Sequence, residues 1–224
     1  MRRLGVSICV LAICALAAPG ASADTILFES AFNQDGAVYS PGTAPANWNL
    51  AAFDAGAGLG TITAQVTGAG LHSLLVFLDI EIDEEVNGFF NEFGATSGAP
   101  SAGLMWEIDE PGYAFGDIYD NFLAGALDGT NGVPVGLPDD VSFALGWNFA
   151  LAGGEVATLR FMTNTMPPAG GFYLVQTDPD SDSSVYFSSE LNITGGEPVI
   201  PEPATLWLLG TGLAFGARRF GRRG

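Results

Sequence analysis

The residues of this sequence most capable of chemistry are carboxylates spaced two apart. Asp79, Glu81 and Asp83 fall in or directly after the predicted strand 72–82, and alternate residues of a strand share one face at separations of about 6.5–7 Å. Paired carboxylates at such separations can act as acid and base in glycoside hydrolysis. Because catalytic pairs usually come from different strands, the favoured interpretation is a solvated edge, where this strand leaves the core.

A second acidic run, Asp178-Pro179-Asp180-Ser181-Asp182, has carboxylates at positions one, three and five. Calcium loops use this spacing because the curling chain then surrounds one ion with carboxylate oxygens. The run departs from the EF-hand pattern, since Ser183 replaces the glycine of position six and Ser189 stands where a bidentate glutamate belongs. The sequence therefore predicts either a calcium site or a polar hairpin turn here. Three further carboxylates would join such a site only if the fold brings them near: Asp109, Glu110 and Asp117.

The remaining candidates each have a structural interpretation that is favoured over the functional one. His72, the single histidine, could be a general base, but a histidine that opens a strand is more often structural. The sequon Asn192-Ile193-Thr194 falls in a predicted strand. Four aromatic side chains could stack on sugar rings, although core packing is favoured: Phe89, Phe90, Phe93 and Trp106.

Charge in the central part of the chain is lopsided. Residues 24–200 hold 24 of the 25 acidic residues and one of the seven basic residues, Arg160, so their net charge is −23. Such a surface repels nucleic acid and anionic lipid. It attracts divalent cations, or it simply keeps an exported protein soluble, which is the favoured interpretation. We expect Arg160 to form a structural ion pair.

The elements that must position these residues are short strands, because apolar stretches alternate with turns rich in glycine and proline. The pattern predicts an all-β body, a β-sandwich with Greek-key or jelly-roll-like connections. It also predicts a loop over 33–47, a helical turn within 84–97 and a helix within 117–127. The predicted strands are 26–28, 48–53, 61–67, 72–82, 105–108, 141–151, 156–162, 172–177 and 185–193.

The N-terminal residues 1–23 read as a signal peptide. A basic start at Arg2 and Arg3 precedes an apolar run over 4–18, and Ala21 and Ala23 satisfy the small-x-small rule of signal peptidase. Cleavage after Ala23 would remove both cysteines of the sequence, so the body should fold without disulfides and without cysteine chemistry.

The C-terminal residues 201–224 have three parts in a fixed order, after a body over 24–195 and a linker over 196–200. Pro201-Glu202-Pro203 should be extended, because proline disfavours helix before it. The uncharged apolar run 204–217 would rise about 21 Å as a helix, short of a bilayer core of about 30 Å. Snorkelling arginines lengthen that span and keep its far end cytoplasmic. They are Arg218, Arg219, Arg222 and Arg223.

In this order, the Pro-Glu-Pro motif, the short transmembrane segment and the arginine cluster resemble the PEP-CTERM sorting signal of Gram-negative bacteria, over about a tenth of the chain. The resemblance implies that exosortase, an intramembrane cysteine protease, recognises Pro201, Glu202 and Pro203 and processes the tail nearby. It also implies a precursor held in the inner membrane, and a mature protein at the cell surface or outside the cell, linked to extracellular polysaccharide and biofilm.

The sequence thus predicts a non-enzymatic exported protein of the extracellular matrix or biofilm. Its expected partners are signal peptidase, exosortase, the inner membrane before processing and extracellular polysaccharide, and we expect no nucleic acid. No cofactor is expected apart from calcium at Asp178, Asp180 and Asp182. The alternative is a secreted β-sandwich protein that binds or hydrolyses polysaccharide.

Overall fold

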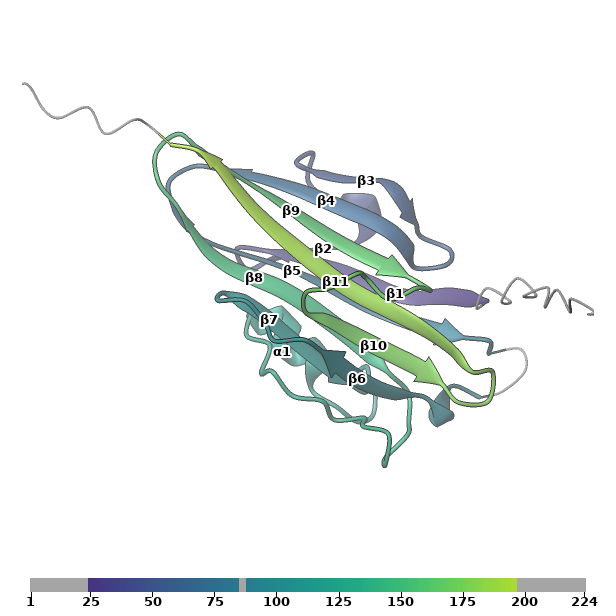
Figure 1. Ribbon diagram of the computed structural model, residues 1–224. Coiled ribbons are helices and arrows are strands. Elements are labelled where there is room, and N and C mark those ends of the chain that lie inside the picture. The colour runs from purple at the N-terminus through teal and green to yellow at the C-terminus, as the bar shows by residue number, and fades with distance from the viewer. Residues whose placement is uncertain (1–23, 85–87, 197–224) are drawn as a thin grey trace, which may run out of the picture.

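The computed structural model describes residues 24–84 and 88–196, which form two antiparallel β-sheets that enclose a common core (Figure 1). The predicted signal peptide, the sorting tail with its apolar run and the linker residues 197–200 lie outside the described residues. Within the described part of the chain, no helix has the length and apolarity needed to cross a membrane. The all-β, sandwich-like fold is confirmed, and the Greek-key or jelly-roll-like connectivity stays a prediction.

Five strands form one sheet, called sheet A, and six form the other, called sheet B. The spatial order of sheet A is β2 (Ala37–Tyr39), β1 (Thr25–Gln34), β5 (Gly70–Ile82), β8 (Ser142–Leu151) and β7 (Leu104–Asp109). The spatial order of sheet B is β3 (Trp48–Asp54), β4 (Leu59–Thr67), β9 (Glu155–Asn164), β11 (Ser183–Gly195), β10 (Tyr173–Asp178) and β6 (Phe93–Ser97). Both sheets therefore combine early and late strands, because the chain crosses repeatedly between them.

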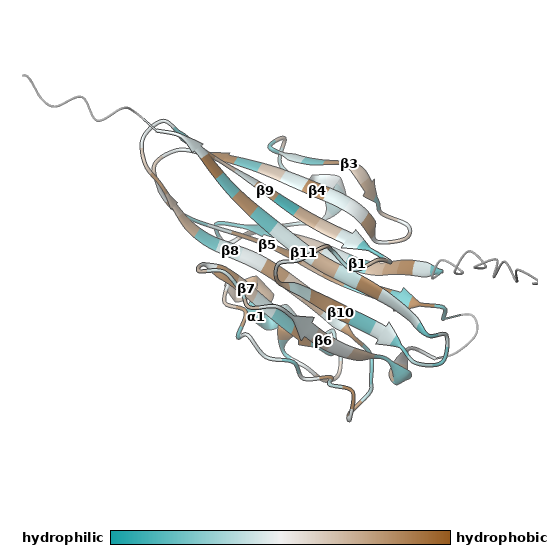
Figure 2. Cartoon of the chain, in the orientation of Figure 1, coloured by the Kyte–Doolittle hydropathy of each residue, from teal (hydrophilic) through white to brown (hydrophobic). Residues whose placement is uncertain are grey.

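The main core lies between the two sheets and follows from the alternation of apolar side chains along the strands (Figure 2). Phe143 of β8 and Phe187 of β11 meet across the core, with their ring centroids 5.1 Å apart. Ser189 interrupts the apolar face of β11 for a structural reason: its Oγ accepts a hydrogen bond of 3.0 Å from the indole N–H of Trp147. A buried indole needs such an acceptor, and the half-buried Ser189 supplies it at the border of the core.

Strand β5 occupies the middle of sheet A, where it pairs with β1 on one edge and with β8 on the other. One of its faces contributes Val76, Leu78, Ile80 and Ile82 to the main core, and the opposite face contributes Leu75 and Phe77 to a second core. The expectation that the acidic end of this strand leaves the core at a solvated edge is wrong. Asp79 and Glu81 are only 1% and 6% exposed.

The second core exists because the helix α1 (Ile118–Ala124) packs on the outer face of sheet A. Phe122 of α1 contacts Phe77 with a ring-centroid distance of 5.8 Å. Asn33 of β1 is fully buried, and its side-chain N–H donates a 2.8 Å hydrogen bond to the carbonyl oxygen of Phe122. Gly125 then ends the helix with a left-handed φ of 68°, a conformation that favours glycine. The helix predicted within 117–127 is thus confirmed.

Most of the predicted strands are found, with bounds that shift by one to several residues. The predicted loop over 33–47 is wrong in part, since it contains the end of β1, all of β2 and the 3-10 turn η1 (Pro41–Thr43). The helical turn within 84–97 is a single 3-10 turn, η2 (Phe89–Asn91), and the edge strand β6 follows it. A strand as short as β2 shows too few residues for an alternating pattern in the sequence, and its extended conformation follows from its hydrogen bonds with β1.

A buried glutamate joins the two sheets near the end of β5. The side-chain amide N–H of Gln176, on β10 in sheet B, donates to the carbonyl oxygen of Ile80 and to Glu92 Oε2. Glu92 Oε1 accepts a 3.1 Å hydrogen bond from the Ile82 N–H. Glu92 is 1% exposed, and this burial raises its pKa to about 9, against the opposing effect of the Gln176 hydrogen bond. Glu92 is therefore protonated in the folded protein at neutral pH.

Truncation of Phe122 to alanine should lower the free energy of unfolding by about 3–5 kcal/mol, because it opens a cavity in the second core. The matched control is Leu123→Ala on the same helix, where the side chain is 40% exposed and the loss should be at most about 1 kcal/mol. Denaturant unfolding measures both variants. Equal losses would show that α1 does not form the contacts described for the second core.

The raised pKa of Glu92 predicts a pH dependence of stability with a definite sign. Between its ordinary pKa of 4.5 and its folded value of about 9, the folded state holds one proton more than the unfolded state. The contribution of Glu92 to stability should therefore be fully present below about pH 4.5 and be lost as pH rises toward 9. For one group the slope is at most about 1.4 kcal/mol per pH unit.

Glu92→Gln should make that slope shallower, as measured by denaturant unfolding between pH 5 and 8 in buffer free of divalent cations. Glu190→Gln is the control, because Glu190 is an exposed glutamate of β11. An unchanged slope in Glu92→Gln would mean that Glu92 is ionised in the folded state.

Candidate functional site

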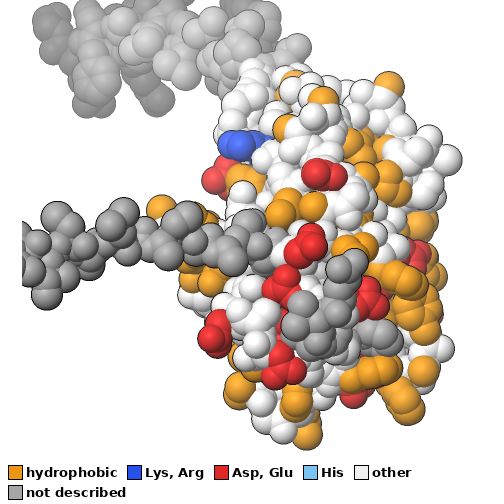
Figure 3. Space-filling model, turned by 90° about the vertical axis from the view of Figure 1, so that its right-hand side faces the viewer, with side chains coloured by type: hydrophobic (Ala, Val, Ile, Leu, Met, Phe, Trp, Pro, Cys, Tyr) orange, Lys and Arg blue, Asp and Glu red, His pale blue; other side chains and the backbone are white. Residues whose placement is uncertain are grey.

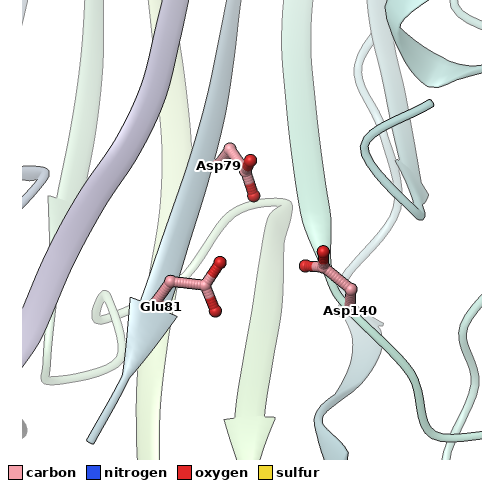
Figure 4. A group of neighbouring side chains, drawn as sticks. All are labelled: Asp79, Glu81 and Asp140. Atoms are coloured by element: carbon pink, nitrogen blue, oxygen red, sulfur yellow. The ribbon is translucent and has the colours of Figure 1, made fainter. Parts of the chain in front are cut away.

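Three carboxylates gather where β5 and β8 begin to separate (Figure 4). Asp79, Glu81 and Asp140 each offer one oxygen, and these oxygens all lie within 4.8 Å of one another. The sheet register explains the meeting, because β5 pairs antiparallel with β8 and sets Asp79 opposite Ser142. Extending that register by two residues sets Glu81 opposite Asp140, and like charges in such a cross-strand position repel.

The hydrogen bonds in this acidic cluster leave part of it without donors. Asp79 Oδ1 accepts a 2.9 Å hydrogen bond from the Ser142 hydroxyl. Glu81 Oε2 and Asp140 Oδ1 are buried and have no hydrogen-bond partner. Of the two cations that the described body contains, Arg160 lies beside Glu190 and His72 lies beside Asp35. No positive side chain among the described residues therefore neutralises the cluster.

Burial and the charges of neighbouring carboxylates raise the pKa of every member of the acidic cluster, and for Asp140 these neighbours are Asp139, Glu110 and Glu84. Burial is the larger cause in each case, and it raises the pKa of Asp79 to about 7, that of Glu81 to about 8 and that of Asp140 to about 6. The Asp140 charge adds to the effect on Asp79 and on Glu81. At neutral pH the cluster consequently keeps part of its negative charge.

A second group of carboxylates, Glu107, Asp117 and Asp128, also has oxygens within 4.8 Å of one another. Its buried member is fully supplied with donors, since Glu107 accepts 3.0 Å and 3.1 Å hydrogen bonds from the Asn121 side chain and the Asp128 N–H. Asp117 and Asp128 are exposed. Because Glu107 already has protein donors and the other two carboxylates are exposed to water, this group needs a cation less than the first does.

The acidic run over 178–182 forms the hairpin turn between β10 and β11. Asp178 is buried, and it accepts hydrogen bonds from the Asp180 N–H at 2.9 Å and from the Ser181 hydroxyl at 2.7 Å. The side chain of Asn91 donates to Asp178 and to Asp180. The polar hairpin turn is confirmed, and calcium at Asp178, Asp180 and Asp182 stays a prediction. Asp109 and Glu110 do not belong to either of the two carboxylate groups found among the described residues.

His72 lies near the start of β5, two residues after the strand begins at Gly70, and both of its ring nitrogens are engaged. Nδ1 lies 3.1 Å from Asp35 Oδ2, and Nε2 lies 3.0 Å from the carbonyl oxygen of Gly68. The hydrogen bond with Asp35 is the main cause that raises the His72 pKa. Two acceptors favour the imidazolium, so His72 has no free nitrogen for a general base. The residue borders a cavity of about 710 Å³ together with Leu71 and Phe149.

The aromatic residues considered for sugar stacking do not form one platform. Trp106 packs against the main core, and its ring lies 5.6 Å from that of Phe172. Phe90 is 65% exposed, whereas Phe93 is half-buried at the start of β6. The side chain of Phe89 lies outside the described residues. A second cavity, of about 540 Å³, is lined instead by Leu104, Trp147, Phe172 and polar residues of β11.

Arg160 forms the ion pair that the sequence predicts, with Nη1 3.7 Å from Glu190 Oε2 across the β9–β11 ladder. Both side chains are at least half exposed, so solvent screens the pair and its contribution to stability is small. The sequon 192–194 lies in β11, in agreement with the prediction that these residues are in a strand.

Sequence analysis does not single out Asp140, the residue that completes the acidic cluster. The available signal is the pair Asp139-Asp140 directly before the predicted strand 141–151, and it becomes informative only once β8 is known to pair with β5. Asp83, which was grouped with Asp79 and Glu81, lies instead just beyond β5 with a positive φ of 54°. Its carboxylate accepts a 3.0 Å hydrogen bond from the Asp24 N–H.

The sorting residues lie outside the described residues, and comparison with known proteins addresses them directly. Residues 199–223 match the model of the PEP-CTERM protein-sorting motif. Neither the curated proteins nor the solved structures contain a significant match to the chain. The match includes the Pro-Glu-Pro tripeptide, the apolar run and the four arginines on which the resemblance was based. The motif therefore identifies the chain as an exported protein that passes through a membrane-anchored precursor and is sorted by exosortase.

Proposed function

We propose that the β-sandwich is a non-enzymatic module that acts in the extracellular matrix or biofilm at the cell surface, after exosortase has processed the tail. The carrying observation is that the sorting motif begins at residue 199, four residues after β11 ends at Gly195. The tail thus leaves directly from the last strand of the body. Extracellular polysaccharide is the proposed partner of the mature protein.

The distribution of charge along the sandwich suits a body that is first held at a membrane by this tail. We call the end where β11 finishes the tail end, and the end where β5 finishes and the hairpin turn 179–182 lies the acidic end. Strand β11 has 13 residues, so at about 3.3 Å per residue it separates the two ends by roughly 40 Å. Figure 3 shows acidic side chains gathered on the acidic end.

Because salt screens electrostatic repulsion over short distances, the separation of the two ends reduces the repulsion between the acidic end and an anionic membrane at the tail end. Carboxylates at the acidic end include Asp79, Glu81, Asp83, Asp140, Asp178 and Asp180. Around the turns at the tail end lie Asp35 and Glu155. A Debye length of about 8–10 Å is short against roughly 40 Å, so anionic lipid at the tail end would not repel the carboxylates of the acidic end.

The assignment of a non-enzymatic role is supported by the state of the residues that could act in catalysis. His72 has both nitrogens engaged, and the acidic cluster is buried between the ends of two strands. His72 borders the first of the two cavities described above, whose lining contains a single carboxylate, that of Asp35, and the second cavity likewise has a single carboxylate in its lining, that of Glu190. Glycoside hydrolysis uses a pair of carboxylates around one cleft, and neither of these two cavities has more than one carboxylate in its lining.

Cleavage after Ala23 is proposed as the step that creates the mature N-terminus. It would turn the Asp24 N–H, which lies 3.0 Å from Asp83 Oδ1, into a charged ammonium group. The new group would then form an ion pair with Asp83 and fasten the start of β1 to the end of β5. The body is in this way already arranged for a chain that begins at Asp24.

N-terminal sequencing of the exported protein should find Asp24 as its first residue. Asp83→Asn should lower the thermal midpoint of this mature form more at pH 6 than at pH 9, because the α-amino group is charged below its ordinary pKa of about 8. Asp182→Asn, an aspartate of the hairpin turn at the same end, is the control. A mature chain that starts at another residue would refute the cleavage site.

Changing Pro201-Glu202-Pro203 to three alanines should block processing and retain a longer, membrane-bound form, since exosortase would lose its recognition motif. The measurement is fractionation and immunoblotting with an antibody to the body, in a host that has an exosortase. The body should fold normally, because these residues lie beyond β11.

The matched control changes Glu197 and Pro198 to alanine, which removes the same residue types just outside the matched range 199–223. This control should be processed like the wild type. Replacing the four arginines with glutamate should instead disturb insertion, because basic residues hold the cytoplasmic end. Wild-type processing of the triple-alanine variant would overturn the proposed sorting.

A further inference from the structure

The acidic cluster of Asp79, Glu81 and Asp140 has a feature that ordinary surface acids lack. Glu81 is 6% exposed, and its Oε2 is a buried oxygen without a hydrogen-bond donor. Figure 4 shows the carboxylate of Glu81, from β5, directed toward that of Asp140, which approaches from the start of β8. A buried oxygen without a partner destabilises the folded state, and a buried charge without a counter-ion does so more strongly.

No described protein group donates a hydrogen bond to Glu81 Oε2 or supplies a positive charge to the cluster. The Ser142 hydroxyl serves Asp79 alone, and Asp140 Oδ1 is also buried without a donor. Arg160 and His72 are paired elsewhere, and the Asp24 N–H is directed at Asp83. What remains is a group of three carboxylates with a formal charge of up to −3, to which only the Ser142 hydroxyl donates among the described side chains.

We propose that Asp79, Glu81 and Asp140 form a binding site for one divalent cation, and that calcium is the ion. Oxygen ligands with formal negative charge select hard cations. Two oxygens bound to one calcium ion at 2.3–2.6 Å lie no more than about 5 Å apart, and the three oxygens of the cluster satisfy this limit. Two oxygens bound to one magnesium ion lie no more than about 4.2 Å apart, and magnesium also demands octahedral geometry.

The surroundings of the cluster also suit calcium. Asp140 is only partly buried, so the ion can enter on its side and water can complete a shell of six to eight ligands. The ion would hold the end of β5 to the start of β8, where the ladder between these strands stops at Asp79 and Ser142. Its charge would replace the mutual repulsion of the carboxylates with attraction to a common centre.

The test is thermal unfolding of the purified full-length chain, first in EDTA and then in 10 mM calcium chloride. We expect calcium to raise the melting temperature by about 3–10 °C, given a dissociation constant of about 10⁻⁴–10⁻³ M as in other extracellular calcium modules. Magnesium at the same concentration should give a smaller shift.

Glu81→Gln should change the melting temperature in opposite directions relative to the wild type, upward in EDTA and downward in calcium. It should raise the melting temperature in EDTA, because it replaces a buried carboxyl group whose Oε2 has no hydrogen-bond donor, and it should abolish the shift with calcium. Asp140→Asn, at a partly buried position, should behave in the same way and serves if Glu81→Gln fails to fold. Asp117→Asn and Asp180→Ala, in the second carboxylate group and the hairpin turn, should retain the shift.

Two outcomes would overturn the proposal. One is a wild-type protein that does not respond to calcium. The other is a response that survives in both Glu81→Gln and Asp140→Asn, and if Asp180→Ala then abolishes it, the ion belongs to the hairpin turn. The triple-alanine variant of the sorting motif should still respond to calcium, so failure of the sorting proposal and failure of this one are distinguishable.

Discussion

The central position of β5 is the constraint on which the rest of the structure depends. This strand is paired along both edges and covered on both faces, by the main core on one side and by α1 on the other. Its sequence nevertheless changes from apolar to acidic on the outer face. Asp79 and Glu81 are therefore held inside the molecule, and the antiparallel register brings Asp140 to them. The buried, unpaired carboxylates are a direct result of this topology.

The acidic cluster and the sorting motif lie toward opposite ends of the β-sandwich. The carboxylates without counter-ions lie where β5 ends, whereas the sorting motif follows β11 at the opposite end. An exported protein that encounters calcium only outside the cell would gain stability at the acidic end after export, which fits a module that works at the cell surface.

Sequence analysis could predict the features that depend on local order. The tail is recognised because its three parts follow one another directly, and the strand 141–151 is recognised because its large side chains alternate with small ones. The Arg160 ion pair could be anticipated because the body contains no other arginine or lysine. Each of these features depends either on residues close together in the sequence or on the charge composition of the whole body.

The features that escaped prediction depend on which segments meet in space. Nothing near Glu81 in the sequence shows that α1, from residues 118–124, covers the same face of sheet A. The role of Ser189 as the acceptor for Trp147 depends on a contact between sheets. The partnership of Glu81 and Asp140 joins residues 59 positions apart, and only the β5–β8 register reveals it.

The measurement that tests this account most directly is a crystal structure of the mature exported protein grown with calcium, with anomalous data that identify the ion. The account predicts one anomalous peak bounded by Asp79, Glu81 and Asp140, at about 2.3–2.6 Å from an oxygen of each. An empty space with Glu81 and Asp140 at hydrogen-bonding distance would contradict it, because a shared proton would then supply what we assign to calcium.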